Sequence, residues 1–263
     1  MKPVLVFDIE TIPDVAGIRV LNGLPNDLSD YEVAEFAFQQ YRASRGSDFL
    51  PHHLQRIVTI SCAFRDEQQF RVFSLSEPEC DEATIIQRFF DGLERFCPQI
   101  VSWNGGGFDL PVLHYRGLVH GAVAARYWDQ GDGDYADSRE FKWNSYIGRY
   151  HARHLDLMDL LSLYQPRANA PLDEMARLMG FPGKLGMDGS AVWDAYREGR
   201  IGEIRDYCET DVVNTYLVFL RFEQMRGHLD SAAYAQELAL VRASLTRSEG
   251  AHWPEFLAAW GGV

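Results

Sequence analysis

Two carboxylates stand two residues apart near the start of the chain, in the sequence VLVFDIET (4–11). The apolar run before them is typical of a strand that is buried on both faces. Because side chains alternate along a strand, we expect Asp8 and Glu10 on one face, at the end of this strand. Paired carboxylates are tolerated there only if they are solvated or bound to a cation. Asp-x-Glu alone favours solvated carboxylates. The rest of the sequence has to decide between solvation and cation binding.

Two further acidic motifs follow it along the chain. Asp109 comes after three glycines in WNGGGFDLP (103–111), near the expected start of a helix, where a carboxylate interacts favourably with the helix dipole. Tyr207 and Asp211 are four residues apart in DYCETDVV (206–213), so they share one face of a helix. Each motif alone is common in ordinary helices. Their occurrence together in one chain favours a single shared site.

The four carboxylates of these motifs suit hard divalent cations. Mg²⁺ and Mn²⁺ prefer oxygen ligands, whereas zinc sites are usually built with cysteine or histidine. Phosphodiester cleavage needs an activated water, neutralised phosphate charge and support for the departing 3′-oxygen. Two such ions roughly 3.5–4 Å apart can supply all three. The sequence therefore predicts two divalent cations, Mg²⁺ or Mn²⁺, in a phosphodiester-hydrolysing site.

The three motifs FDIET (7–11), NGGGFDLP (104–111) and YCETD (207–211) resemble those of the DEDD superfamily of 3′–5′ exonucleases. The likeness is to the tyrosine-bearing branch, because Asp206 stands where the other branch has a histidine. The chain looks most like stand-alone bacterial proteins similar to the exonuclease domain of family-B DNA polymerases. This resemblance implies an α/β, ribonuclease-H-like fold with a mixed five-stranded sheet flanked by helices.

The resemblance also implies roles for individual residues. Asp8, Glu10 and Asp211 would hold the ion that generates the nucleophile, and Asp8 would bridge to a second ion that Asp109 supports directly or through water. Tyr207 would orient the attacking water, since a normal phenol pKa of about 10 makes it a poor base. Contacts to the substrate are expected from five residues: Thr11, Ile12, Asn104, Phe108 and Lys184. Core packing is an equal alternative for Phe108, and an ordinary surface position is slightly favoured for Lys184.

The activity implied is hydrolysis at the 3′ end of single-stranded or frayed DNA, with release of nucleoside monophosphates. DNA is favoured over RNA only through the resemblance. The formal net charge of −13 argues against broad nucleic-acid binding and favours recognition of a strand end. Two alternatives remain open: a non-catalytic end-binding module on the same fold, and a hydrolase that scavenges oligonucleotides.

The elements expected around these motifs form one domain, residues 1–263, with the motifs within 7–211. We expect a helix near 31–43, a hairpin of strands 56–64 and 69–75, and a helix within 77–96. A strand at 99–104 and a helix from 109 should follow, and a second strand-to-helix passage lies in 151–164. From 171 the pattern is helical, with breaks at 181–190 and near Gly227. The helical extension, about 228–263, could pack on the domain or meet a partner.

Other features have plainer interpretations. Residues 127–150 are rich in aromatic and basic residues, typical of a flap that guides a single strand or of a surface hairpin pinned by its own aromatics.

Asp156 is better explained as a helix N-cap than as support for the site. Asp206 and Glu209 are better explained as solvated. No apolar stretch is long enough for a membrane helix and no signal peptide is evident, so we expect a cytoplasmic chain. We also expect no polymerase segment. Four scattered cysteines are expected to be buried thiols: Cys62, Cys80, Cys97 and Cys208.

Overall fold

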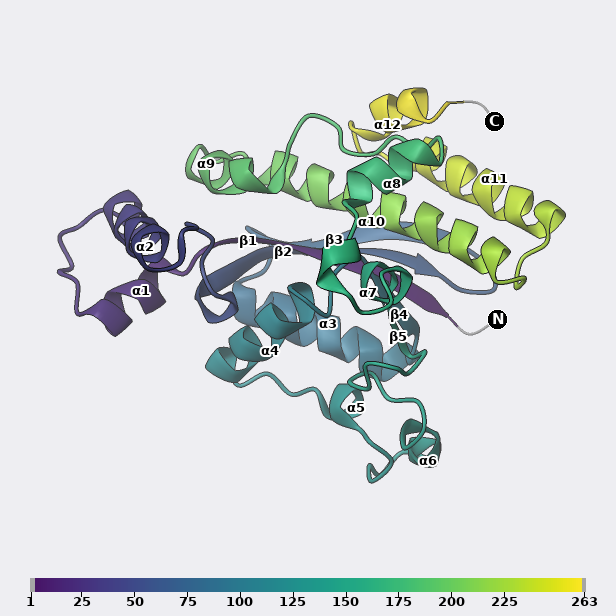
Figure 1. Cartoon of the computed structure of the whole chain (residues 1–263), viewed down its shortest axis with the longest axis horizontal. Helices are drawn as coiled ribbons and strands as arrows, with labels where there is room; N and C mark the ends of the chain where they lie inside the picture. Colours follow the sequence, from purple (N-terminus) through teal and green to yellow (C-terminus); the bar gives the residue numbers. More distant parts are fainter. Residues whose placement is uncertain (1–2, 262–263) are drawn as a thin grey trace.

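A five-stranded sheet lies between two groups of helices in the computed structural model, which describes residues 3–261 (Figure 1). Residues 1, 2, 262 and 263, at the ends of the expected domain, lie outside the described residues. The strand order is β3-β2-β1-β4-β5, with β1 antiparallel to β2 and parallel to β4. This confirms the expected mixed sheet. The strands are β1 (Val4–Pro13), β2 (Gln55–Arg65), β3 (Phe70–Ser76), β4 (Gln99–Ser102) and β5 (His154–Asp156).

The helices cover both faces of the sheet, and the long ones agree with the helical periodicity of the sequence. On one face lie α3 (Glu82–Phe96) and α4 (Asp109–His120), and on the other α10 (Ile201–Met225), α11 (Ser231–Arg247) and α12 (Trp253–Ala259). Beyond the end of β1, α1 (Val15–Asn22) and α2 (Asp30–Arg45) form a separate pair, on the left of Figure 1. The short helices are α5 (Ala125–Trp128), α6 (Ser138–Phe141), α7 (Leu157–Leu161), α8 (Leu172–Leu178) and α9 (Val192–Arg197).

Strand β1 is longer than the apolar run predicts. It continues to Pro13 because β2 pairs with it along its whole length. Strand β4, in contrast, pairs only with residues 4–6 of β1. Asp8 and Glu10 therefore lie beyond the end of β4 and not at the end of their own strand, which corrects the sequence-based expectation.

The two faces of β1 have different surroundings. Leu5, Phe7 and Ile9 pack with α3 and α4, whereas Val4 and Val6 pack with α10. The alternation therefore directs Asp8 and Glu10 toward α10, as expected. The pairing with β2 shifts after Glu10, where Val58 is left over as a bulge. Bulges are common next to active sites because they redirect the strand locally.

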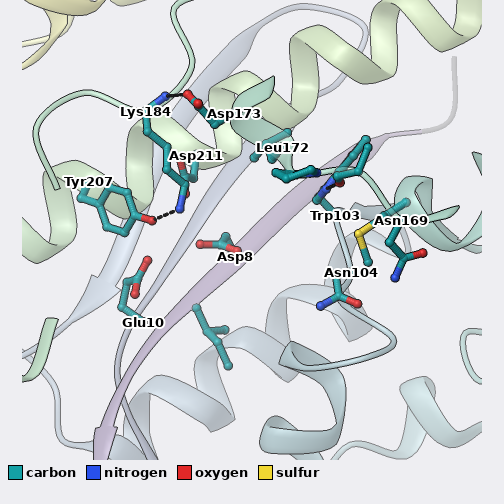
Figure 2. A pocket seen from close by; sticks show the side chains of 14 residues that line it. Asp8, Glu10, Trp103, Asn104, Asn169, Leu172, Asp173, Lys184, Tyr207 and Asp211 are labelled. Atoms are coloured by element: carbon teal, nitrogen blue, oxygen red, sulfur yellow. Dashed lines mark hydrogen bonds and ion pairs between the residues drawn. The ribbon is translucent and has the colours of Figure 1, made fainter. Parts of the chain in front are cut away.

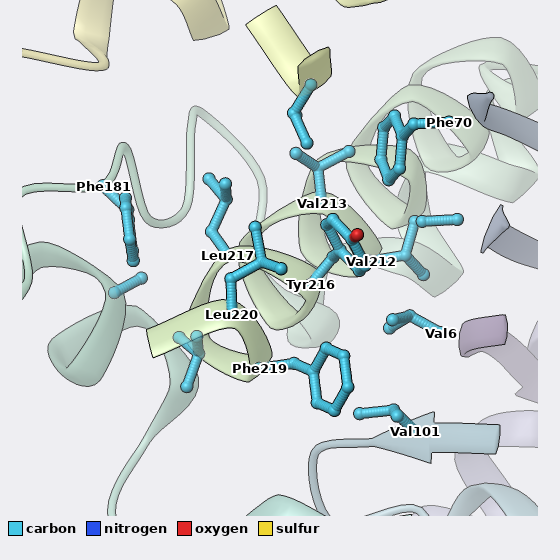
Figure 3. Packing of buried hydrophobic residues seen from close by; sticks show 14 of the residues in the cluster. Val6, Phe70, Val101, Phe181, Val212, Val213, Tyr216, Leu217, Phe219 and Leu220 are labelled. Atoms are coloured by element: carbon cyan, nitrogen blue, oxygen red, sulfur yellow. The ribbon is translucent and has the colours of Figure 1, made fainter. Parts of the chain in front are cut away.

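Helix α10 is the centre of the core on its face of the sheet (Figure 3). Its apolar side chains contact Val6 of β1, Val101 of β4 and Phe70 of β3. The C-terminal segment belongs to the same core, since Trp253 and Phe256 of α12 are 3% and 0% exposed. Of the two interpretations offered for this segment, the structure therefore shows packing on the domain.

The segment 127–150 is not a hairpin, because these residues, all within the described range, contain the end of α5 and helix α6 but no strand. Tyr127, Phe141 and Tyr146 are buried in the core beside α3 and α4. The Arg153 guanidinium lies 3.8 Å from the Phe141 ring centre and is buried with it. The aromatic residues thus pin the segment to the domain, while Trp143 remains 76% exposed.

Two expectations about the whole chain can be compared with the structure. All four cysteines carry free thiols; Cys62 and Cys208 are buried, while Cys80 and Cys97 are only half-buried. Within residues 3–261, no helix combines the length and the apolar sequence needed to cross a membrane.

Candidate active site

A cavity of about 480 Å³ opens where β4 ends, between β1 and α10 (Figure 2). Asp8 and Glu10 reach it from β1, and Tyr207 and Asp211 reach it from one face of α10. Asn104 borders it from the loop after β4. Three of the sequence motifs therefore contribute to one cavity, as the sequence analysis expects.

Asp109 lies behind this cavity, as the first residue of α4. Its Oδ1 accepts a hydrogen bond of 3.1 Å from the backbone N–H of Ile9, the residue between Asp8 and Glu10. That N–H is free for a side chain because β4 has already ended. Asp109 is 4% exposed, and its negative charge is one of the causes that raise the pKa of Asp8. All four carboxylates are thus brought together.

The cluster is electrostatically costly without a cation. Burial, and then the neighbouring carboxylates, raise the pKa of Asp8 and of Glu10 well above their ordinary values. Burial raises the pKa of Asp109 to about 7 and that of Asp211 to about 6. Among the described residues, the buried Oδ1 of Asp211 has no hydrogen-bond partner. Four carboxylates with an unpaired buried ligand atom fit hard divalent cations, although the Cys208 thiol lies beside Asp8 and Glu10.

Lys184 borders the site although its side chain is 36% exposed, so it is a surface lysine that also reaches the cavity. Its Nζ donates a 2.6 Å hydrogen bond to the Tyr207 hydroxyl and lies 3.9 Å from Oδ2 of Asp211. Its backbone N–H donates to Oδ1 of Asp173 at 2.8 Å. Burial raises the pKa of Tyr207 above its ordinary value, so the phenol stays protonated.

Asp156 fixes the loop that carries Asn104. Its carboxylate accepts hydrogen bonds from the N–H groups of Asn104 at 3.0 Å and Gly106 at 2.8 Å. It also caps α7 by accepting from the Asp159 N–H at 3.2 Å. The N-cap expected from the sequence is therefore present, and the same side chain supports the site. Asn104 has a φ of 67°, a left-handed conformation that this pairing stabilises.

Three of the expected substrate contacts do not line the cavity. The Thr11 hydroxyl donates to Gln55 on β2 at 2.9 Å. Ile12 is 3% exposed and packs in a separate apolar cluster near α9. The ring of Phe108 packs against Phe49, with ring centres 5.6 Å apart, on a different side of the glycine loop. Of the five expected contacts, Asn104 and Lys184 border the cavity.

Sequence reasoning missed several residues of the site. The Cys208 thiol lies 3.5 Å from the Asp8 carbonyl oxygen and 3.6 Å from its Oδ2. Its spacing of three from Asp211 was the available signal, since residues three apart are neighbours on a helix. Trp103 and Asp173 also line the cavity, and nothing in the residues around Asp173 indicates its position.

Asp206 and Glu209 are only partly solvated, with side chains 29% and 14% exposed, which corrects a further expectation in part. Glu209 accepts a 2.7 Å hydrogen bond from Ser74, and its other oxygen lies 3.2 Å from Nε2 of His252. Oδ1 of Asp206 lies 3.4 Å from Nδ1 of the same histidine. The reason is tertiary: the C-terminal segment folds back over α10 and covers both carboxylates.

A comparison with protein families gives one match. Residues 47–260 match the model of a family described as predicted 3′–5′ exonuclease related to the exonuclease domain of PolB. The matched range contains Asp109, Tyr207 and Asp211, and it begins after β1. No match was found among curated proteins.

A comparison with solved structures supports the fold. The family B DNA polymerase from the hyperthermophilic archaeon Pyrobaculum calidifontis is similar, with a TM-score of 0.51 and 20% sequence identity. The match covers 99% of this chain and 27% of the polymerase chain, so this chain corresponds to a minor part of that protein. At this identity the likeness concerns the fold alone, and it confirms the expected ribonuclease-H-like α/β class.

Proposed function

We propose that this chain, which belongs to the family of predicted 3′–5′ exonucleases related to the exonuclease domain of PolB, shortens single-stranded or frayed DNA from its 3′ end. Nucleoside monophosphates would be released, and the chain would belong to the tyrosine-bearing branch of the DEDD superfamily. One observation carries the proposal: Asp8, Glu10, Asp109 and Asp211 form a single buried acidic cluster beside one cavity.

The cluster would hold two divalent cations, Mg²⁺ or Mn²⁺. Asp8, Glu10 and Asp211 would hold one ion, and Asp8 with Asp109 would support the other. When bound, the ions would supply Lewis-acid activation of water and stabilisation of the departing 3′-oxygen. The excess of buried negative charge would then be balanced, which removes the main cost of folding this site.

Tyr207 would position the attacking water. Its hydroxyl accepts a hydrogen bond from Lys184 and has Asp211 as a further hydrogen-bonding neighbour, and its remaining lone pair is available to a water molecule. Because its pKa is raised, the phenol cannot take up a proton as a base and acts through orientation. The Lys184 ammonium, which is partly exposed at the cavity, would also attract the phosphate group.

The cavity has the size of a site for a single terminal nucleotide. Its volume of about 480 Å³ falls within the range of small-molecule pockets, roughly 300–1,000 Å³. Asn104 would supply a polar contact, and the Trp103 indole is fixed at the rim by its hydrogen bond to the Ala170 carbonyl at 3.1 Å. Recognition of one strand end in this way is compatible with a net charge of −13.

A panel of end-labelled substrates tests this proposal. With Mn²⁺ or Mg²⁺, 5′-labelled single-stranded DNA should shorten one nucleotide at a time, and a 3′ label should appear as mononucleotide. EDTA should abolish both results, because on this proposal hydrolysis requires the cations that the carboxylates hold. A labelled RNA strand, assayed in parallel, establishes the sugar preference. A duplex with a 3′ mismatch establishes whether a frayed end is needed.

Matched variants make the test specific to the site. Asp8→Ala should be inactive while its circular dichroism spectrum matches that of the parent protein. Asp27→Ala, which removes an exposed carboxylate between α1 and α2, should keep full activity. Full activity in Asp8→Ala would contradict the proposal, as would cleavage from the 5′ end. Binding of 3′ ends without hydrolysis would indicate the non-catalytic module, and cleavage of only very short strands the scavenging hydrolase.

A further inference from the structure

We propose a second metal site, distinct from the acidic cluster at the cavity of Figure 2, in which Asp206, Glu209 and His252 hold one divalent transition-metal ion. One donor atom from each residue lies within 4.8 Å of the other two. Asp206 and Glu209 are three apart on α10, so their side chains project from the same side of the helix. His252 immediately precedes α12 and reaches them from the C-terminal segment.

The histidine lacks the hydrogen bonds that its burial requires. Its side chain is 13% exposed, and both ring nitrogens are buried. Each faces a carboxylate, Nδ1 at 3.4 Å from Asp206 and Nε2 at 3.2 Å from Glu209. Within residues 3–261, however, neither nitrogen makes a hydrogen bond, because the directions are unfavourable. A buried imidazole is normally paired, so the arrangement points to a ligand that these three side chains share.

The charge around the histidine is also unbalanced. Asp206 and His252 line a cavity of about 380 Å³ together with Glu203 and Glu255. With Glu209, this region has four carboxylates. The guanidinium groups paired with them come from Arg200, 2.8 Å from Glu203, and Arg205, 3.2 Å from Asp206. Because Arg200 also lies 2.8 Å from Glu198, carboxylates outnumber guanidinium groups here, and a bound cation would offset part of this negative charge.

The donor set selects the class of metal. One imidazole nitrogen with two carboxylates is a mixed nitrogen and oxygen set, which suits Mn²⁺, Co²⁺, Ni²⁺ or Zn²⁺ better than Mg²⁺. Three protein ligands beside a cavity also leave positions for water, as in many zinc sites with an open position. The metal specificity would therefore differ from that of the cluster around Asp8, where four carboxylates supply the ligands.

The position of this second metal site connects the C-terminal segment to the active site. It joins α10 to the start of α12 and so fastens the C-terminal segment. Tyr207 lines this cavity as well as the one in Figure 2, and Leu185–Met187, which follow Lys184, line it too. A bound ion would thus stabilise the backbone on which Tyr207 and Lys184 are placed.

The site can be tested in a variant whose other cluster is disabled, Asp8→Asn with Asp211→Asn and Cys208→Ala, because the Cys208 thiol lies beside Asp8 and Glu10. Titration calorimetry with Zn²⁺ should then show one equivalent bound, and Co²⁺ should produce a visible absorption spectrum. Adding His252→Gln should weaken Zn²⁺ binding by more than about a hundredfold, the upper end of what loss of an outer partner of a metal ligand costs. Zn²⁺ should raise the melting temperature of the first variant and not of the second.

The controls decide between this site and a purely structural histidine. His228→Gln, in the same background, removes another histidine that lies 3.0 Å from a carboxylate, Glu223, and should leave Zn²⁺ binding unchanged. If His252→Gln does not fold, Glu209→Gln is the alternative variant. The amide oxygen of the new glutamine can still accept the hydrogen bond from Ser74. Absence of saturable Zn²⁺ binding in the folded background variant would overturn the proposal, as would unchanged affinity without His252.

Discussion

The Tyr207 hydroxyl accepts its hydrogen bond from the Lys184 ammonium at 2.6 Å, and this contact fixes its orientation beside the acidic cluster. We expect Tyr207→Phe to lower kcat on single-stranded DNA by about a hundredfold, the effect of a misplaced reactant. The affinity for Mn²⁺ should stay the same, because the phenol is not proposed as a ligand. Steady-state kinetics and titration calorimetry measure the two quantities separately.

Tyr115→Phe is the matched control, because this phenol is 48% exposed on α4 and packs edge-on against the His53 ring, away from the acidic cluster. Its kcat should equal that of the parent protein. A parental kcat in Tyr207→Phe would exclude the positioning role.

The raised pKa values of the carboxylates predict how the metal-free protein responds to pH. Asp109 and Asp211 titrate at about 7 and about 6 when folded, above the unfolded value of about 3.9. The unfolded chain therefore loses these protons first. The cluster costs no stability below about pH 4, and the cost grows as pH rises to about 7.

Removing one charge should reduce this cost. In EDTA at pH 7.5, Asp8→Asn should raise the free energy of unfolding by about 1–3 kcal/mol, the size of a pKa change of one to two units. The gain should vanish near pH 4. Urea denaturation across this pH range measures the difference between the variant and the parent, so titrations elsewhere in the protein cancel. The exposed Asp27→Asn should show no gain, and a gain in Asp8→Asn that persists at pH 4 would contradict the electrostatic explanation.

At the scale of elements, the loop after β4 depends on one side chain of the neighbouring strand. Asp156, the last residue of β5, accepts from two N–H groups of that loop and caps α7. We expect Asp156→Ala to cost about 1–3 kcal/mol of stability, because the N–H groups of Asn104, Gly106 and Asp159 all lose their acceptor. It should also raise KM for DNA, since Asn104 borders the cavity. Denaturation and kinetics check both parts.

Asp81→Ala is the control for this prediction. Asp81 caps α3 through a single 2.8 Å hydrogen bond from the Thr84 N–H, on the far side of the sheet from α10. Its loss should cost about 1 kcal/mol and leave KM unchanged. An unchanged KM in Asp156→Ala would mean that the loop keeps its conformation without the carboxylate.

The elements also show what can be predicted from this sequence. The helices and the hairpin follow from periodicity, and the clustering of Asp8, Glu10, Tyr207 and Asp211 follows from motif spacing within those elements. The length of β1 cannot be predicted from local sequence, because it depends on where β2 continues and where β4 ends. The contacts of Asp206 and Glu209 with His252 depend on a segment more than 40 residues later in the chain, which local sequence does not reveal. The position of Lys184 likewise depends on how its loop packs on α10.

At the scale of the whole molecule, the C-terminal segment shares its core with the sheet. We therefore propose a single folding unit and expect Phe256→Ala to cost about 3–5 kcal/mol, as for other buried phenylalanines. The variant should still unfold in one transition, at lower denaturant concentration. Phe49→Ala, at a position that is 60% exposed, should change stability little. Two separate transitions would instead indicate that α11 and α12 unfold independently.

The acidic cluster draws its members from both ends of a long stretch of sequence, with Cys208 touching Asp8 across 200 positions. During synthesis, the first strand leaves the ribosome long before α10 has been translated. On the proposed function, the nascent polypeptide therefore has an incomplete site during most of its synthesis. Nuclease activity would begin only once translation has passed Asp211 and α10 has docked, so the order of the motifs delays it until late in translation.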